Sequence, residues 1–175
     1  TMPAPAASAP ATERASAISV RAALPEDCHS IVQMIRDLAS FQGVGDRVFV
    51  TAEILKRDGF GPQKKFEALI AEQRGKHVGL AMFQEHYSVW DGGSVLQITD
   101  LFVDESMRGT GVGFRLSQEV GRLARDRGCV GLQLNMVHAN PSRTSLDRMG
   151  FVHQDDLLHY RLDSVGLRNL LEQDR

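Results

Sequence analysis

The chain has 175 residues, of which 42% are hydrophobic and 24% charged, with a formal net charge of -2 and a pI near 6.3. This length suits one folded domain with a core of its own and is short for two. No apolar run reaches the ~20 residues that a membrane-spanning helix needs, and the charge balance creates no general field for nucleic acid. We therefore expect a soluble protein with a small-molecule partner, and neither a nucleic-acid nor a membrane partner.

Residues 1–17, TMPAPAASAPATERASA, consist largely of Ala, Pro, Ser and Thr. This composition buries too little side chain to offset the entropy of ordering, so we expect a flexible tail before a single domain over residues 18–175. The segment lacks the charged start and the apolar stretch of a secretory signal, which favours a cytoplasmic protein. Cys28 and Cys129 are far apart and lack the spacing of a metal site, which indicates free thiols and no bound metal.

The first half of the chain combines short β-favouring runs with amphipathic helices. The sequence predicts a strand over residues 18–21 and then a helix from Pro25 to about Gly43, because a proline followed by two acids suits a first helical turn. A second helix over residues 51–57 has Thr51 as its capping residue. Three strands separated by glycine-containing turns follow, over residues 66–72, 77–87 and 95–103.

The second half of the chain contains a strand-helix-strand connection. A helix is predicted over residues 111–127, where apolar side chains keep one helical face, and a strand over residues 132–137. A short helix over residues 141–149 is closed by Gly150, and a last strand is expected over residues 158–162. The order β-α-α-β-β-β-α-β-α-β predicts an α+β fold with a mixed, mostly antiparallel sheet flanked by helices.

A glycine-rich loop, Arg108-Gly109-Thr110-Gly111-Val112-Gly113, connects the third of these mid-chain strands to the next helix. Such a loop offers free backbone N–H groups and the positive end of a helix dipole to an anion, and Arg108 adds a charge-assisted contact. A nucleotide P-loop and a dinucleotide fingerprint both fail, because Phe114 stands where either would need another residue. A backbone cradle for a pyrophosphate remains, beside the alternative of an ordinary glycine-rich turn.

Five segments in a fixed order extend the pattern beyond the loop: TAEILKRDGFG at 51–61, FEALIAE at 66–72, VGLAMFQEHYSVWDG at 78–92, TDLFVDESMRGTGVG at 99–113 and NPSRTSLDRMGF at 140–151. With them, residues 18–162 resemble the GNAT N-acetyltransferase superfamily and, within it, the diamine (spermidine/spermine) acetyltransferase branch. The resemblance implies the GNAT fold, in which the fourth and fifth strands splay to admit the pantetheine arm of acetyl-CoA. It also implies a homodimer.

The resemblance further implies which residues hold acetyl-CoA. They lie in the strand before the loop, in the loop itself and after the fifth strand: Leu101, Phe102, Val103, Arg108, Gly109, Thr110, Gly111, Val112, Gly113, Asn140 and Ser142.

At two positions that the resemblance assigns to catalysis, this sequence has other residue types than the family. The resemblance would place a glutamate immediately before Asp100 and a tyrosine in the helix after the fifth strand, but this sequence has Thr99 and Leu146 there. Thr99 and Asp100 point to opposite faces of a regular strand, so Asp100 replaces the lost acid only if a bulge re-aims it, and is otherwise structural. Ser145 could reach the sulfur, and His138 could act as acid or base, although each also suits an ordinary surface or packing role.

Four residues in segments that face substrate in relatives remain candidates for the acceptor side. Tyr87 and Trp90 either line an acceptor pocket or pack, and packing is the favoured interpretation for Trp90. Asp58 and Glu85 either face substrate or are solvated charges. Without the family's acid the case for spermidine weakens, and a smaller primary amine, an amino acid or a thialysine-like compound remains open.

Two functions follow from these residues. In the first, the protein is an acetyl-CoA-dependent N-acetyltransferase that works by direct attack of a small-molecule amine. In the second, it is an acyl-CoA-binding sensor or regulatory protein with little transferase activity. The enzyme is favoured, because proximity contributes about 7–11 kcal/mol and the loss of one acid-base group need not abolish turnover.

Overall fold

The computed structural model describes residues 18–41, 43–136, 140 and 142–173. The chain forms two compact units, Thr1–Asn140 and Pro141–Arg175. Of the helices in the described ranges, none has the length and apolar character that a membrane crossing requires. Residues 1–17, predicted as a tail, lie outside the described residues.

The first unit is a five-stranded sheet with helices on both faces. The strand order is β1-β2-β3-β4-β5, in which the first four strands pair antiparallel and β5 runs parallel to β4. The mixed sheet confirms the predicted α+β class. In chain order the elements are β1 (Ile18–Ala22), η1 (Pro25–Asp27), α2 (Cys28–Phe41), η2 (Gly45–Arg47), α3 (Ala52–Phe60), β2 (Glu67–Gln73), β3 (Lys76–Ser88), β4 (Gly93–Val103), η3 (Glu105–Met107), α4 (Val112–Asp126) and β5 (Gly131–Leu134).

Local sequence explains the connections of this sheet. Arg74 and Gly75 both have positive φ, 51° and 76°, which is the geometry of a two-residue hairpin turn whose twist matches its strands. The parallel pairing of β5 with β4 needs a crossover, and α4 provides it between them.

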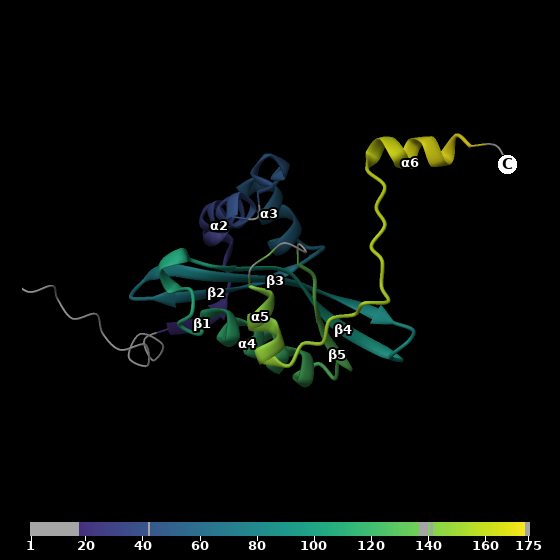
Figure 1. Cartoon of the computed structure of the whole chain (residues 1–175). Helices are drawn as coiled ribbons and strands as arrows, with labels where there is room; N and C mark the ends of the chain where they lie inside the picture. The colour runs from purple at the N-terminus through teal and green to yellow at the C-terminus, as the bar shows by residue number, and fades with distance from the viewer. Residues whose placement is uncertain (1–17, 42, 137–139, 141, 174–175) are drawn as a thin grey trace, which may run out of the picture. The chain divides into compact units, whose positions relative to one another are not determined.

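Helices α2 and α3 cover one face of the sheet and α4 covers the other (Figure 1), and an apolar cluster lies on each face. On one face Val112, Leu116 and Val120 of α4 pack with sheet residues such as Phe83. On the other face α2 and α3 pack with sheet residues that include Met82. Neighbours on β3 therefore serve opposite clusters, as the pleat of a strand requires.

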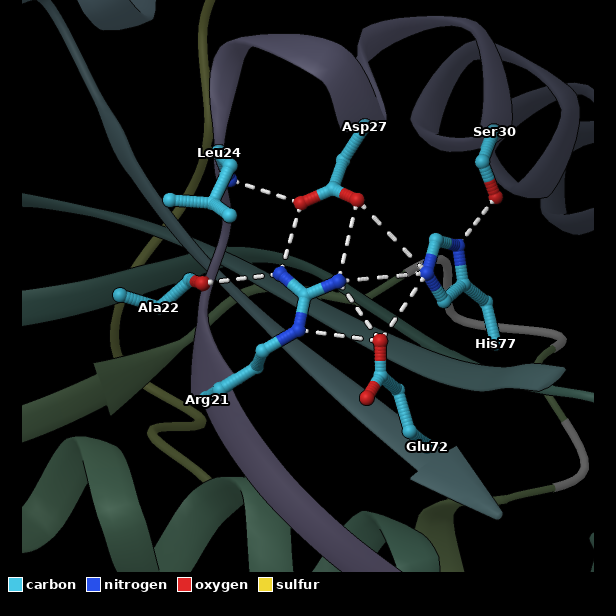
Figure 2. A network of polar contacts seen from close by, with 7 residues as sticks. All are labelled: Arg21, Ala22, Leu24, Asp27, Ser30, Glu72 and His77. Carbon is cyan, nitrogen blue, oxygen red and sulfur yellow. Dashed lines mark hydrogen bonds and ion pairs between the residues drawn. The ribbon is translucent and has the colours of Figure 1, made fainter. Parts of the chain in front are cut away.

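A polar network on the side of α2 ties three strands to the start of that helix (Figure 2). Arg21 of β1 donates to both carboxylate oxygens of Asp27, at 2.7 and 3.0 Å, and to Glu72 of β2 at 2.6 and 3.0 Å. The hydrogen bonds from Arg21 lower the pKa of Asp27 and of Glu72. Because Asp27 is buried, its charge depends on this partner.

His77, near the start of β3, completes the network. Its Nε2 lies 3.2 Å from Oε1 of Glu72, and its Nδ1 lies 2.6 Å from Oγ of Ser30 on α2. The imidazole thus links β2 and β3 to the first turn of the helix (Figure 2). The cluster fixes where α2 meets the sheet, on the face that carries Met82.

The second unit contains α5 (Arg143–Met149) and α6 (Ser164–Leu171). The prediction of a last strand over residues 158–162 is wrong, because these residues form no regular element and pair with none of the described strands. Leu158 and Tyr160 are 75% and 85% exposed, so the apolar alternation that suggested a strand has no buried face. The helix α6 was not predicted; Asp163 caps it by accepting a hydrogen bond from Gly166 N at 2.8 Å.

Candidate active site

A β-bulge in β4 shapes the centre of the sheet. Met82 pairs with Asp100 and Phe83 pairs with Ile98, which leaves Thr99 as an extra residue on β4. In a regular strand Ile98 and Asp100 would share a face. Here Ile98 packs in the cluster on the α4 side, whereas Asp100 stands opposite Met82, which belongs to the cluster on the α2 side. The bulge therefore turns Asp100 toward α2.

Thr99 and Asp100 have different environments at this bulge. Thr99 Oγ1 donates to the carbonyl of Met82 at 3.3 Å, so this hydroxyl stabilises the irregular pairing. Burial raises the pKa of Asp100, and a hydrogen bond with Thr99 opposes that rise. A carboxylate with a raised pKa accepts a proton more readily than an ordinary aspartate, which is the property required of a general base.

The same bulge marks the point where β4 leaves β5. Their parallel pairing runs from Val95 opposite Gly131 to Ile98 opposite Leu134. Among the described residues no strand pairs with the second half of β4 on this side, so backbone groups along that edge are open to a ligand. Leu101, Phe102 and Val103, predicted to contact the cofactor, lie in this half of β4.

The glycine-rich loop leads from β4 into α4. Gly109 and Gly111 have φ of 76° and 91°, a left-handed conformation that side chains with a Cβ rarely adopt. Gly111 is the N-cap of α4, and Arg115 is the residue whose N–H bonds back to Gly111 O, at 3.0 Å. The N–H groups of the first helical turn before Arg115 therefore have no acceptor within the helix, as an anion cradle requires.

Gly113 has no requirement for glycine within the protein itself. Its φ is not in the left-handed region, and a Cβ at this position would lie 3.5 Å from Val103 Cγ2, an ordinary contact. Glycine in a helix weakens the helix relative to alanine. The fold does not require glycine at position 113, but a ligand that approaches the backbone closely would require it.

Arg108 presents an unused cation at the same loop. Its guanidinium carbon lies 3.9 Å from the ring centroid of Phe41 at the end of α2. Within the described residues its side chain has no hydrogen-bond acceptor, so its N–H groups are available to a phosphate. The loop thus combines a helix N-terminus, two glycines with positive φ and an arginine without a hydrogen-bond acceptor among the described residues.

Comparison with known proteins identifies this arrangement. The Acetyltransferase (GNAT) family matches residues 33–151, more than half of the chain. The chain belongs to this family. It is 30% identical over 165 residues to the thialysine N-epsilon-acetyltransferase of Mus musculus, covering 86% of this chain and 95% of the mouse protein. It is also 32% identical over 126 residues to the human spermidine/spermine N(1)-acetyltransferase-like protein 1, covering 68% of this chain and 17% of that protein.

A solved structure agrees with the GNAT fold. An aminoglycoside N-acetyltransferase in complex with CoA matches with a TM-score of 0.68 at 19% identity, covering 83% of this chain and 94% of that one. The predicted GNAT fold and the predicted cofactor, acetyl-CoA, are confirmed. The residues present fit this cofactor, because the loop provides phosphate donors and the open edge of β4 provides backbone groups for its amide-containing arm.

The acceptor candidates on this GNAT chain do not gather around Asp100. The carboxylate of Asp58 pairs with Arg57 at 2.8 Å and with Lys65 at 3.1 Å, and hydrogen bonds from both lower its pKa. Glu85 stands opposite Leu96, in the cluster on the α4 side, and lies 3.8 Å from Arg127. Asp58, on α3, is thus paired with cations close to it in the sequence, and Glu85 lies on the face of the sheet away from Asp100.

Tyr87 and Trp90 lie at the far end of the β3–β4 hairpin and are 67% and 96% exposed. The interpretation of Trp90 as a packing residue is therefore wrong: the tight turn from Ser88 to Gly93 carries the ring into solvent. A sequence motif reports the kind of residue but not whether a core lies beneath it.

The remaining predicted residues of the GNAT site follow β5. His138 lies outside the described residues. Asn140 is buried at the end of the first unit, and Ser142 is the N-cap of α5 in the second. Ser145 is exposed on α5, and Leu146 follows it where the family's tyrosine would be.

Sequence reasoning missed two residues near the cofactor loop. Phe41 stacks on Arg108 from a helix far away in the sequence. Ser117 is 6% exposed, and its hydroxyl has no hydrogen-bond partner in the part of the chain that the structure describes. It lies one turn beyond Gly113 on α4, a spacing that puts both on one side of the helix. The sequence did contain a signal for Ser117, because it is a polar residue within the apolar stripe of α4.

Proposed function

We propose that this GNAT N-acetyltransferase acetylates a primary amine of a small, lysine-like molecule and uses Asp100 as its general base. The observation that carries the proposal is the bulge at Thr99, which turns a half-buried carboxyl toward α2 beside the open edge of β4. Its mouse relative is named for thialysine, a primary amine. That curated relatives are N-acetyltransferases supports the enzyme over an acyl-CoA-binding sensor.

Bound acetyl-CoA would supply the acetyl group as a thioester whose C–S bond breaks as the amide bond forms, with CoA leaving as a thiol that carries the proton lost by the amine. The chain's residues hold acetyl-CoA and prepare the amine: the loop from Arg108 to Gly113 binds phosphate, and the backbone near Phe102 polarises the carbonyl. An amine with a pKa of ~10.4 is mostly charged at pH 7, and its deprotonation costs about 4–5 kcal/mol. Asp100 lowers this barrier by accepting the proton, directly or through water.

The charge around the bulge favours an acceptor with one amine near the carboxyl over a long polyamine. Asp100 is the acid on the α2 side of β4, while Asp58 is neutralised by its neighbours and Glu85 lies on the other face. Thr99 adds no charge where the family's glutamate would stand.

We further propose that the protein is a cytoplasmic homodimer with residues 18–175 as its domain. Cys28 and Cys129 are both free, which suits a reducing compartment. Large apolar side chains are exposed at Phe49, Val89 and Trp90, and a second copy would bury some of them. Sedimentation of the full chain would test the dimer.

Thiol release from acetyl-CoA tests the activity, measured against thialysine, lysine, other amino acids, spermidine and aminoglycosides. We expect the highest kcat/KM for a lysine-like primary amine. Release with spermidine as the best acceptor would contradict the proposed substrate class. Tight binding of acetyl-CoA without release for any acceptor would contradict the enzyme.

A further inference from the structure

Phe41 is an aromatic residue without a role in the core. It ends α2, its surface is 39% exposed, and it belongs to neither apolar cluster of the sheet. The contact that the structure assigns to its ring is the guanidinium of Arg108, centred 3.9 Å from the ring centroid. A guanidinium at this distance from an aromatic ring is in cation–π contact with it.

Arg108 lies where this contact matters. It caps η3 with extended backbone, and three residues later Gly111 caps α4. The charge of Arg108 helps to lower the pKa of Asp104. This carboxylate already accepts a hydrogen bond from Ser106 N at 3.0 Å and lies 3.9 Å from Lys76. The guanidinium therefore keeps its hydrogen-bonding edge free while its face rests on the ring.

We propose that Phe41 is a positioning residue that holds the Arg108 guanidinium ready for a phosphate of acetyl-CoA. The inference rests on the proposed function for the identity of the phosphate ligand. A long arginine side chain loses rotamer freedom when it binds, and a stacked one has already lost part of it. The ring thus raises the affinity for acetyl-CoA without touching the acetyl group or the amine.

The test compares Phe41→Leu and Phe41→Tyr with the unchanged protein. We expect Phe41→Leu to raise the Kd and KM for acetyl-CoA about 2- to 5-fold, with kcat and the KM for the amine unchanged. That factor corresponds to about 0.4–1 kcal/mol at 1.36 kcal/mol per tenfold. Phe41→Tyr keeps the ring face and should restore the affinity.

A double-mutant cycle shows whether the ring acts through Arg108. In an Arg108→Gln background, Phe41→Leu should change the Kd for acetyl-CoA by less than about 1.5-fold, because the cation that the ring supports is gone. Equal effects of Phe41→Leu in both backgrounds would overturn the proposal. Phe41→Met, which keeps an apolar side chain without a ring face, replaces Phe41→Leu if that variant does not fold.

A truncated donor separates phosphate binding from general damage. Acetyl-pantetheine lacks the nucleotide phosphates, so its KM should be the same in Phe41→Leu and in the unchanged protein. An equal loss with both donors would overturn the proposal and mark the ring as structural. Failure of the proposed function is distinct: the unchanged protein would then transfer no acetyl group to any amine, while calorimetric Kd values for acetyl-CoA still decide the role of Phe41.

Discussion

Gly113 and Gly121 form a matched pair of glycines in α4, and replacing each with alanine separates helix stability from ligand binding. A Cβ at Gly121 would meet no atom within 4 Å, and a Cβ at Gly113 would lie 3.5 Å from Val103. Neither change creates a clash. Each should raise the free energy of unfolding by about 0.5–1 kcal/mol, because alanine favours a helix over glycine.

For a protein of this size the expected rise in Tm is about 1–4 °C for either variant. Their effects on acetyl-CoA should differ. Gly113 lies in the first turn of α4, where a methyl group would hold phosphate oxygens away from the free N–H groups. Loss of one hydrogen bond to a charged group costs about 1.5–3 kcal/mol, so the Kd should rise about 10- to 100-fold for Gly113→Ala.

Thermal unfolding measures the Tm of each variant, and calorimetric titration measures its Kd for acetyl-CoA. Gly121→Ala should be more stable than the unchanged protein and bind acetyl-CoA equally well. The reasoning fails if Gly113→Ala also binds with unchanged affinity, because the backbone of α4 would then not approach the ligand. It fails too if Gly121→Ala weakens binding, because helix stiffness would then explain both results.

Three further predictions concern charge at the site and in the polar network. Asp100→Asn should lower kcat about 10²- to 10⁴-fold in steady-state assays with unchanged affinity for acetyl-CoA. Burial raises the pKa of Asp100, so the folded protein favours the neutral carboxyl and loses stability as pH rises. Asp100→Asn should therefore have a higher Tm than the unchanged protein at pH 7. An unchanged kcat would exclude Asp100 as the base. Asp27→Asn should lower the free energy of unfolding by about 2–3 kcal/mol at pH 7. Because Arg21 lowers the pKa of Asp27 and Glu72, the unchanged protein should lose stability as pH falls below their ordinary values near 4, and urea titrations of Asp27→Asn should show a smaller loss. Gly111→Asp should abolish measurable acetyl-CoA binding, whereas Gly111→Asn, which tolerates the φ of 91° without the charge, should retain part of it; equal losses would assign the effect to backbone strain alone.

The glycine-rich loop from Arg108 to Gly113 and the helix after it could be predicted from sequence because their signals are local. An apolar strand, an arginine and alternating glycines specify the loop and the start of α4 within one short segment. Their geometry depends on backbone conformation at Gly109 and Gly111 and little on distant packing. The fold class followed for the same reason, since most strands and helices carry their own periodicity.

The bulge in β4 could not be located from sequence. Leu96, Ile98 and Phe102 are separated by even numbers of residues, so a period of two assigns them all to one face. In the structure Phe102 packs on the α2 side and the other two pack on the α4 side. A single extra residue reverses every side chain beyond it, and apolar residues on both faces conceal the reversal.

The failed predictions concern features that depend on distant partners. A strand over residues 158–162 needs a neighbouring edge to pair with, and alternation of apolar residues does not provide one. The exposed Trp90 and the stacked Phe41 likewise depend on what the fold brings near them. Asp58 was predicted from its segment, but Lys65 neutralises it from across a turn.

The pairing of β1 has a consequence for the order in which the sheet forms. The β2–β3 hairpin closes between Gln73 and Lys76, whereas β1 must bring Ile18 to Gln73 across the whole of α2 and α3. Closing the longer loop costs more chain entropy, so we expect the hairpins to assemble first and β1 with α2 to dock late. The Arg21 network joins β1 and the start of α2 to the rest of the sheet, so its stability would set how often these two elements detach. The hydrogen-bonded amides of α2 would then exchange with solvent faster than those of the β2–β3 hairpin.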